Sequence, residues 1–124
     1  MIKCKQLTKR FGELAALNSV DLSVQTGSIF GLVGSNGAGK STLLRTLAGV
    51  YRPDGGEATV NSQQVFENRE IKSKLRFVPD ELRLPRGCTL LSMGRQLSGL
   101  YPAWDEAWFT ELCMRFPVNE KARF

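Results

Sequence analysis

The segment GSNGAGKST at residues 34–42 constrains the fold of this chain more than any other part of the sequence. It follows the apolar run SIFGLV and precedes LLRTLAGV, in which leucines recur with helical spacing. A nearly continuous apolar run is typical of a strand buried on both faces of a parallel sheet. The glycines, lysine and serine have the spacing of a phosphate-binding loop between a strand and a helix. The local pattern therefore predicts an α/β fold built around a P-loop.

The residue types in this loop suit a phosphate ligand. Gly34, Gly37 and Gly39 allow positive φ angles and a close approach of the backbone to an anion. Lys40 supplies positive charge for the β and γ phosphates, and Ser41 supplies a hydroxyl for Mg²⁺. The helix that follows directs its positive N-terminus at the same place. We therefore predict binding of a nucleoside triphosphate.

The remaining pattern divides the chain into a strand-rich and a helical part. Strands are expected at residues 2–7, 17–24, 28–33 and 75–78, with a small hairpin around Asn61 and Ser62. Helices are expected from Lys40 to Gly49, from Thr89 to Gly99, and from Asp105 to a stop at Pro117. The sequence thus predicts an antiparallel β subdomain with a partial P-loop NTPase core at residues 1–78. Residues 79–124 are predicted to start a helical subdomain of the same domain.

The composition of the chain argues against several kinds of partner and cellular location. The chain carries 17 Lys and Arg against 12 Asp and Glu, but the basic residues are scattered, which argues against a nucleic-acid partner. Its 3 cysteines are far apart and form no C-x-x-C pair, so neither a disulfide framework nor a cysteine metal site is indicated. No segment approaches the roughly 20 apolar residues of a membrane span, and the N-terminus lacks the apolar core of a signal peptide. We expect a chain that is neither transmembrane nor secreted.

The sequence LTKRFGELAALNSVDLSVQTGSIFGLVGSNGAGKSTLLRTLAGVYRPDGGEATVNSQQV, from Leu7 to Val65, resembles the N-terminal half of an ABC transporter ATPase subunit. The likeness continues more loosely to the end of the chain. It implies ATP and Mg²⁺ as ligands, and a cytoplasmic location at the inner face of the membrane. It also implies two partners, a transmembrane subunit and a second ATPase subunit.

The resemblance also assigns residues to the nucleotide. It implies that Phe11 stacks on adenine, where tyrosine is commoner in the family, and the alternative is a core phenylalanine at a strand end. Thr42 is placed near the α phosphate by analogy. The implied ATP-binding residues are Phe11, Gly34, Ser35, Asn36, Gly37, Ala38, Gly39, Lys40, Ser41 and Thr42.

The segment LRFVPDE at residues 75–81 has two interpretations. By the resemblance, Asp80 stands where the family has a glutamine that reaches Mg²⁺, and the predicted metal ligands are then Ser41 and Asp80. A carboxylate can approach a metal, but it cannot donate a hydrogen bond as an amide does. Alternatively, the segment is a Walker B strand in which Asp80 and Glu81 are catalytic. Arg76 and Pro79 weigh against that reading, because they interrupt a central apolar strand.

The last third of the chain suggests a partner surface. The resemblance maps residues 79–104 to the region that receives a cytoplasmic helix of the transmembrane subunit. Trp104, Trp108 and Phe109 form an aromatic stripe that suits such an interface, and ordinary packing of the helices on the sheet is the alternative. The segment LSGLY begins like the family's LSGGQ signature but lacks its second glycine and glutamine. We therefore interpret Gly99 as the end of a helix.

The activity that the resemblance implies is ATP binding with little hydrolysis. The family's hydrolysis uses a histidine, a Walker B aspartate, a catalytic glutamate and a signature motif, all downstream of this sequence, which contains no histidine. Phosphoryl transfer relies on such positioned groups. The alternatives are a complete small P-loop kinase or NTPase that uses Asp80 and Glu81, or a non-catalytic binding module. Uncovered sheet edges in a half-domain also predict self-association.

Overall fold

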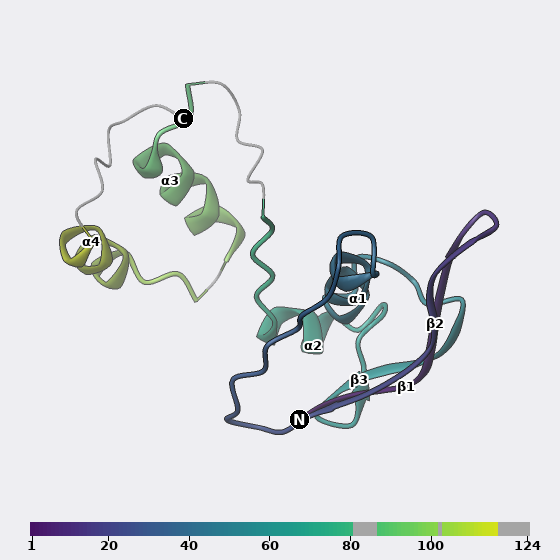
Figure 1. Ribbon diagram of the computed structural model, residues 1–124. Helices are drawn as coiled ribbons and strands as arrows, with labels where there is room; N and C mark the ends of the chain where they lie inside the picture. Colours follow the sequence, from purple (N-terminus) through teal and green to yellow (C-terminus); the bar gives the residue numbers. More distant parts are fainter. Residues whose placement is uncertain (81–86, 102, 117–124) are drawn as a thin grey trace. The chain divides into compact units, whose positions relative to one another are not determined.

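The computed structural model describes residues 1–80, 87–101 and 103–116 (Figure 1). Its residues group into two compact units, Met1–Val78 and Pro79–Phe124. The first unit contains a sheet and two short helices. The described part of the second unit contains two helices.

The sheet of the first unit is antiparallel and has 4 strands in the order β2-β1-β3-β4. The strands are β1 (Ile2–Phe11), β2 (Leu14–Val24), β3 (Gly55–Val60) and β4 (Gln63–Gln64). β1 and β2 form a hairpin whose register runs from Ile2 opposite Val24 to Phe11 opposite Leu14. The strands expected at residues 2–7 and 17–24 and the hairpin around Asn61 and Ser62 are therefore confirmed, with longer first strands than expected.

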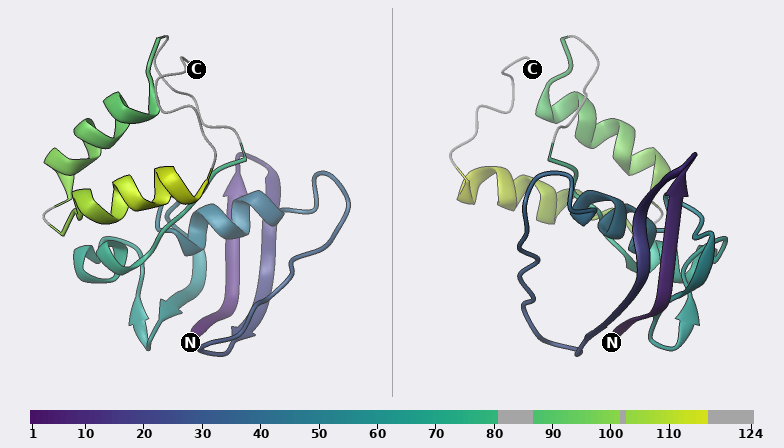
Figure 2. Two further views of the ribbon diagram at one scale, coloured as in Figure 1. Left: turned by 90° about the vertical axis from the view of Figure 1, so that its left-hand side faces the viewer. Right: turned by 45° about the vertical axis from the view of Figure 1, so that its right-hand side comes forward.

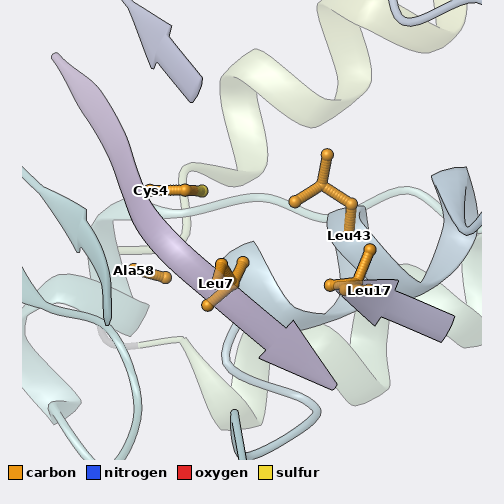
Figure 3. Close-up of a cluster of buried hydrophobic side chains, with 5 residues drawn as sticks. All are labelled: Cys4, Leu7, Leu17, Leu43 and Ala58. Atoms are coloured by element: carbon orange, nitrogen blue, oxygen red, sulfur yellow. The ribbon is translucent and has the colours of Figure 1, made fainter. Parts of the chain in front are cut away.

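The helix α1 (Lys40–Leu47) packs on one face of this sheet, against β2 and β3 (Figure 2). Burial of apolar side chains fixes this contact. Leu43 of α1 joins a buried cluster that also contains Cys4, Leu7, Leu17 and Ala58 from the strands (Figure 3). Leu7 is fully buried at the centre of the sheet. The predicted helix after the phosphate loop thus contributes Leu43 to the core of the unit.

The end of α1 follows the glycine signal in the sequence. Gly49 has a φ of 70°, in the left-handed region. The N–H of Val50 donates to the carbonyl of Arg45 at 2.8 Å, and the N–H of Gly49 donates to that of Thr46 at 3.0 Å. These two bonds form a Schellman motif, which satisfies carbonyls that the helix leaves without partners. Gly49 ends the helix as predicted.

Two predicted strands do not form. Residues 28–33 and 75–78 have no regular secondary structure, and the exposed residues include Ile29 and Val33, of which Val33 is 93% exposed. A strand requires neighbouring backbone to complete its hydrogen bonds, and the described sheet is made of residues 2–24 and 55–64 alone. Only Leu32 of the apolar run packs against the core. Apolar composition was therefore an insufficient guide to strand formation here.

The helix α2 (Arg69–Lys74) was not expected from the sequence. Asn68 caps it, because its side-chain oxygen accepts a hydrogen bond from the N–H of Ile71 at 3.1 Å. Ile71 is buried, and Lys74 forms an ion pair with Glu70 at 2.8 Å, one turn apart. Six residues are too few for a helical repeat of apolar residues to be recognisable. The capping asparagine was the available signal.

The second unit contains α3 (Leu90–Leu100) and α4 (Glu106–Arg115). Thr89 caps α3 as predicted, in a capping box with Ser92, and Asp105 caps α4 by accepting a bond from the N–H of Trp108 at 2.9 Å. The predicted end at Gly99 is wrong by one residue, because α3 continues to Leu100 and Gly99 has no positive φ. Tyr101 is extended, as a residue before proline prefers to be. The stop expected at Pro117 lies outside the described residues.

Candidate functional site

The phosphate loop holds the ammonium group of Lys40 against its own backbone. The Nζ atom donates to the carbonyl of Gly34 at 2.8 Å and to that of Ser35 at 2.7 Å. An ammonium group has three N–H donors, so one remains after the two bonds that the described residues provide. The positive charge is therefore held within the loop, in a place where it can meet an incoming anion.

The glycines of the loop have different roles. Gly37 and Gly39 have φ angles of 83° and 84°, which residues with a Cβ rarely adopt. Gly34 does not have a positive φ, contrary to the expectation for it. A Cβ on Gly34 would lie 3.4 Å from the Cβ of Ala38 and 3.8 Å from Cδ of Lys40. The missing side chain of Gly34 thus leaves space inside the loop, whereas the positive φ angles of Gly37 and Gly39 turn the loop backbone.

Gly39 also joins the loop to the sheet. A Cβ at this position would lie 2.3 Å from the carbonyl oxygen of Ala16 and 3.2 Å from Cδ2 of Leu17, both in β2. The register of the hairpin shifts at this point: Lys9 pairs with Leu17 and Arg10 pairs with Ala15, which leaves Ala16 as the extra residue of a bulge. The end of the phosphate loop is therefore seated on a bulge of β2, where only glycine fits.

The N-terminus of α1 completes the candidate anion site. Its cap residue, Gly39, has no side chain to accept hydrogen bonds, and no acidic residue lies in the first turn. The first bond of the helix runs from the N–H of Leu43 to the carbonyl of Gly39 at 2.8 Å. The preceding N–H groups of the first turn have no capping side chain. Such a helix end favours phosphate through its free donors and its dipole.

The predicted contact residues differ in accessibility. Residues 34–38 and Ser41 are exposed, and Gly39, Lys40 and Thr42 are half-buried. The exposed Ser41 hydroxyl can serve as a metal ligand beside phosphate oxygens. Mg²⁺ is commonly bound in this way, by one or two protein groups together with phosphates and water. Among the described residues there is no cluster of three or more His, Cys, Asp or Glu side chains that could hold a metal without a nucleotide.

The aromatic residue assigned to adenine is Phe11, at the end of β1. It is not part of the buried core, and the residue is 45% exposed. The ring meets that of Tyr51 edge to face, with centroids 5.3 Å apart and planes at 76°. Tyr51, two residues after Gly49, was not among the site residues predicted from the sequence. Phe11 remains the predicted base-stacking residue.

Asp54 connects the segment after α1 to the end of β1. Its Oδ2 atom accepts a hydrogen bond from the N–H of Arg10 at 2.7 Å and lies 3.0 Å from Nζ of Lys9. Its own N–H donates to the carbonyl of Thr8 at 2.9 Å. The Arg10 hydrogen bond, followed by the Lys9 interactions, lowers the pKa of the Asp54 carboxyl below its usual value. The carboxylate is therefore ionised at neutral pH.

The acidic candidates Asp80 and Glu81 follow the first unit in the sequence. Asp80 is exposed and belongs to the second unit, and Glu81 lies outside the described residues. Asp80 stays a predicted Mg²⁺ ligand. Both residues stay predicted catalytic groups under the alternative interpretation.

The aromatic stripe of the helical unit separates into two environments. Phe109 of α4 packs on α3 at Gly94, where an added Cβ would lie 2.7 Å from Cζ of the ring. Trp104 lies against Phe109, with ring centroids 5.1 Å apart. Trp108 is 48% exposed, and the Arg115 guanidinium lies 5.6 Å from the centre of its ring. Trp108 is thus the member of the stripe that is most available to a partner.

Comparisons with known proteins find relatives across most of the chain. The model of the ABC transporter family matches residues 17–123. The petrobactin import ATP-binding protein FpuD of Bacillus anthracis is 32% identical over 109 residues, which cover 86% of this chain and 40% of the relative. The ABC transporter ATP-binding protein YtrB of Bacillus subtilis is 27% identical over 124 residues, or 100% of this chain and 42% of the relative. The chain thus spans less than half the length of these two proteins.

Solved structures confirm the predicted fold class, a partial P-loop core with an antiparallel sheet. The ATP-binding subunit of an ABC transporter superposes with a TM-score of 0.71 at 26% identity, covering 86% of this chain and 44% of that chain. A dimeric ATP-binding cassette in a post-hydrolysis state, bound to ADP and phosphate, superposes with a TM-score of 0.71 at 25% identity. The match covers 93% of this chain and 55% of that chain. Within the described residues, no helix has the length and hydropathy of a membrane span.

Proposed function

This chain belongs to the ABC transporter family, and from that premise we propose that it binds ATP with Mg²⁺ at the phosphate loop. The observation that carries this proposal is the arrangement of Lys40 at the uncapped N-terminus of α1. The loop glycines and Thr42 contact the phosphates, Ser41 holds the metal, and Phe11 stacks on adenine. Bound Mg²⁺ neutralises phosphate charge.

We further propose that the chain binds ATP far better than it hydrolyses it. The sequence contains no histidine that could sense the γ phosphate. No acidic residue lies in the first turn of α1 to orient a water molecule. Without a positioned base and a group that senses the γ phosphate, phosphoryl transfer loses orders of magnitude in rate. Binding therefore exceeds turnover in this proposal.

The cellular role that we propose is energising transport across a membrane. Its support is that relatives are named for transport, including petrobactin import in Bacillus anthracis and sulfate/thiosulfate import by CysA of Mycobacterium bovis, which is 53% identical over 71 residues. The proposed partners are a transmembrane subunit, contacted through residues 79–104, and a second ATPase subunit. The proposed location is cytoplasmic, at the inner face of the membrane. A nucleic-acid partner is not part of the proposal.

Calorimetric titration with Mg²⁺-ATP, together with a phosphate-release assay, tests the proposal. We expect dissociation constants in the micromolar range, a loss of at least tenfold in affinity for Lys40→Ala, and no release above background. Lys3→Ala is the matched control, because Lys3 is an exposed lysine of β1 that takes no part in the loop. Equal affinities for wild type and Lys40→Ala would contradict the proposed site.

The same assays address the alternative of a complete small kinase or NTPase. That alternative requires phosphate release that Lys40→Ala abolishes and that Asp80→Asn or Glu81→Gln also reduces. Transfer to a small-molecule acceptor would identify a kinase. Either result would replace the proposal that this chain binds ATP without efficient turnover.

A further inference from the structure

The end of β1 that carries Phe11 extends beyond its neighbour in the sheet. β3 begins at Gly55, which pairs with Thr8, so Arg10 has no β3 residue opposite it. The Asp54 side chain takes the place of the missing strand, since its Oδ2 atom accepts the Arg10 N–H at 2.7 Å. The Asp54 backbone N–H meanwhile donates to Thr8 at 2.9 Å. One residue therefore continues the hydrogen bonding of the sheet to the residue before Phe11.

The same carboxylate fixes a cation beside the Phe11 ring. Lys9 Nζ lies 3.0 Å from Asp54 and 5.5 Å from the centre of the Phe11 ring. The Lys9 side chain is only 13% exposed, so this ammonium group is more shielded from water than a surface lysine. Charge-assisted hydrogen bonds of this kind are stronger than neutral ones. Asp54 thus restrains both the backbone before the ring and the charge beside it.

The Phe11 ring is placed at the same end of the hairpin as the phosphate loop. Phe11 pairs with Leu14, and Ala16, two residues further along β2, is the residue against which Gly39 is seated. Two strand residues span about 7 Å. The position of the end of β1 therefore decides how a base on Phe11 is aligned with phosphates in the loop.

We propose that Asp54 is a positioning residue for the adenine site, holding the end of β1 and Lys9 so that Phe11 is presented to the base. This inference rests on the proposed function, and specifically on stacking by Phe11. Asp54 does not touch the nucleotide in this proposal. It acts through Phe11, so it strengthens the binding of the base and not the binding of the phosphates.

Titration with two ligands tests this division, using Mg²⁺-ATP and Mg²⁺-tripolyphosphate on the full chain. Base stacking on an aromatic ring predicts that Phe11→Ala weakens ATP binding about tenfold or more and leaves tripolyphosphate binding unchanged. We expect Asp54→Ala to weaken ATP binding about fivefold with the same selectivity. In the Phe11→Ala background, Asp54→Ala is expected to have no further effect. Asp54→Asn, whose amide oxygen can still accept the Arg10 bond, is expected to restore part of the loss.

Glu57→Ala is the control, because Glu57 forms an ion pair with the exposed Lys5, at 3.4 Å, elsewhere on the same sheet. Equal losses for ATP and tripolyphosphate in Asp54→Ala would overturn the inference and indicate a general structural role. Unchanged ATP binding in Asp54→Ala would also overturn it. If Phe11→Ala weakened the binding of ATP and of tripolyphosphate equally, both the inference and adenine stacking by Phe11 would be overturned. Tripolyphosphate binding by Lys40→Ala tests the phosphate site separately from the adenine site.

Discussion

Gly39 is the residue at which backbone conformation and steric fit can be separated by experiment. Its positive φ strains any residue with a Cβ, and the added atom would also overlap the Ala16 carbonyl. Gly27 is the matched control, because its φ is 78° but no atom lies within 4 Å of an added Cβ. We expect Gly27→Ala to lower the free energy of unfolding by about 1–2 kcal/mol through backbone strain alone. Gly39→Ala should cost about 1–3 kcal/mol more through overpacking.

Urea denaturation of both variants measures these costs, and calorimetry with Mg²⁺-ATP measures the effect on binding. We expect Gly27→Ala to bind ATP like the wild type, whereas Gly39→Ala should bind at least tenfold more weakly, because the loop can no longer be seated on β2. Equal stability of the two variants would mean that Gly39 is needed for its φ angle only. Undiminished ATP binding by Gly39→Ala would contradict the role of this contact in the site.

At the scale of the elements, the contact between α3 and α4 depends on a glycine. Gly94 is buried against the Phe109 ring, and Gly99 of the same helix faces open space. Alanine has a higher helix propensity than glycine by about 1 kcal/mol at an interior position. We therefore expect opposite signs: Gly99→Ala should stabilise the helical unit by up to about 1 kcal/mol, and Gly94→Ala should destabilise it by about 1–3 kcal/mol.

Urea titration followed by circular dichroism at 222 nm would measure this pair of substitutions. The comparison is informative because both substitutions add the same atom, a Cβ, to the same helix. Stabilisation by both variants would mean that Phe109 does not pack on Gly94 and that helix propensity alone decides the outcome.

The elements predicted correctly from sequence are those with local signals. Alternation of side chains predicted the hairpin strands, and the capping side chains of Thr89 and Asp105 predicted α3 and α4. The strand expected at residues 28–33 was wrong because a strand depends on partners that local sequence does not reveal. The helix α2 was missed because it is too short to show a periodic pattern. Local signals thus specify helix ends better than strand pairing.

The candidate site shows the same division. The phosphate loop could be identified from nine consecutive residues, because its glycines, Lys40 and Ser41 are adjacent in the sequence. The seating of Gly39 on the β2 bulge and the hydrogen bond from Arg10 to Asp54 join residues that are far apart in the chain. These contacts depend on the register of the sheet, which the sequence alone did not provide.

At the scale of the whole molecule, the apolar segment before the phosphate loop decides how the chain behaves at high concentration. Ile29 and Val33 are almost fully exposed, and Phe30 is half-exposed. The backbone of residues 29–33 forms no strand within the described part of the chain. Burial of apolar surface and pairing of such backbone between two chains are both favourable. We therefore expect the chain to self-associate through this segment.

Sedimentation velocity over a range of protein concentrations tests this expectation. The wild type should shift towards dimers and larger species as its concentration rises, and Ile29→Lys with Val33→Lys should remain monomeric under the same conditions, because the added charges oppose burial. Leu14→Lys is the matched control, since Leu14 is also exposed but lies at the turn of the β1–β2 hairpin. Its association should match the wild type. A wild type that stays monomeric at high concentration would contradict the prediction. If Leu14→Lys lost association as fully as the double variant, association would depend on exposed apolar residues in general and not on residues 29–33.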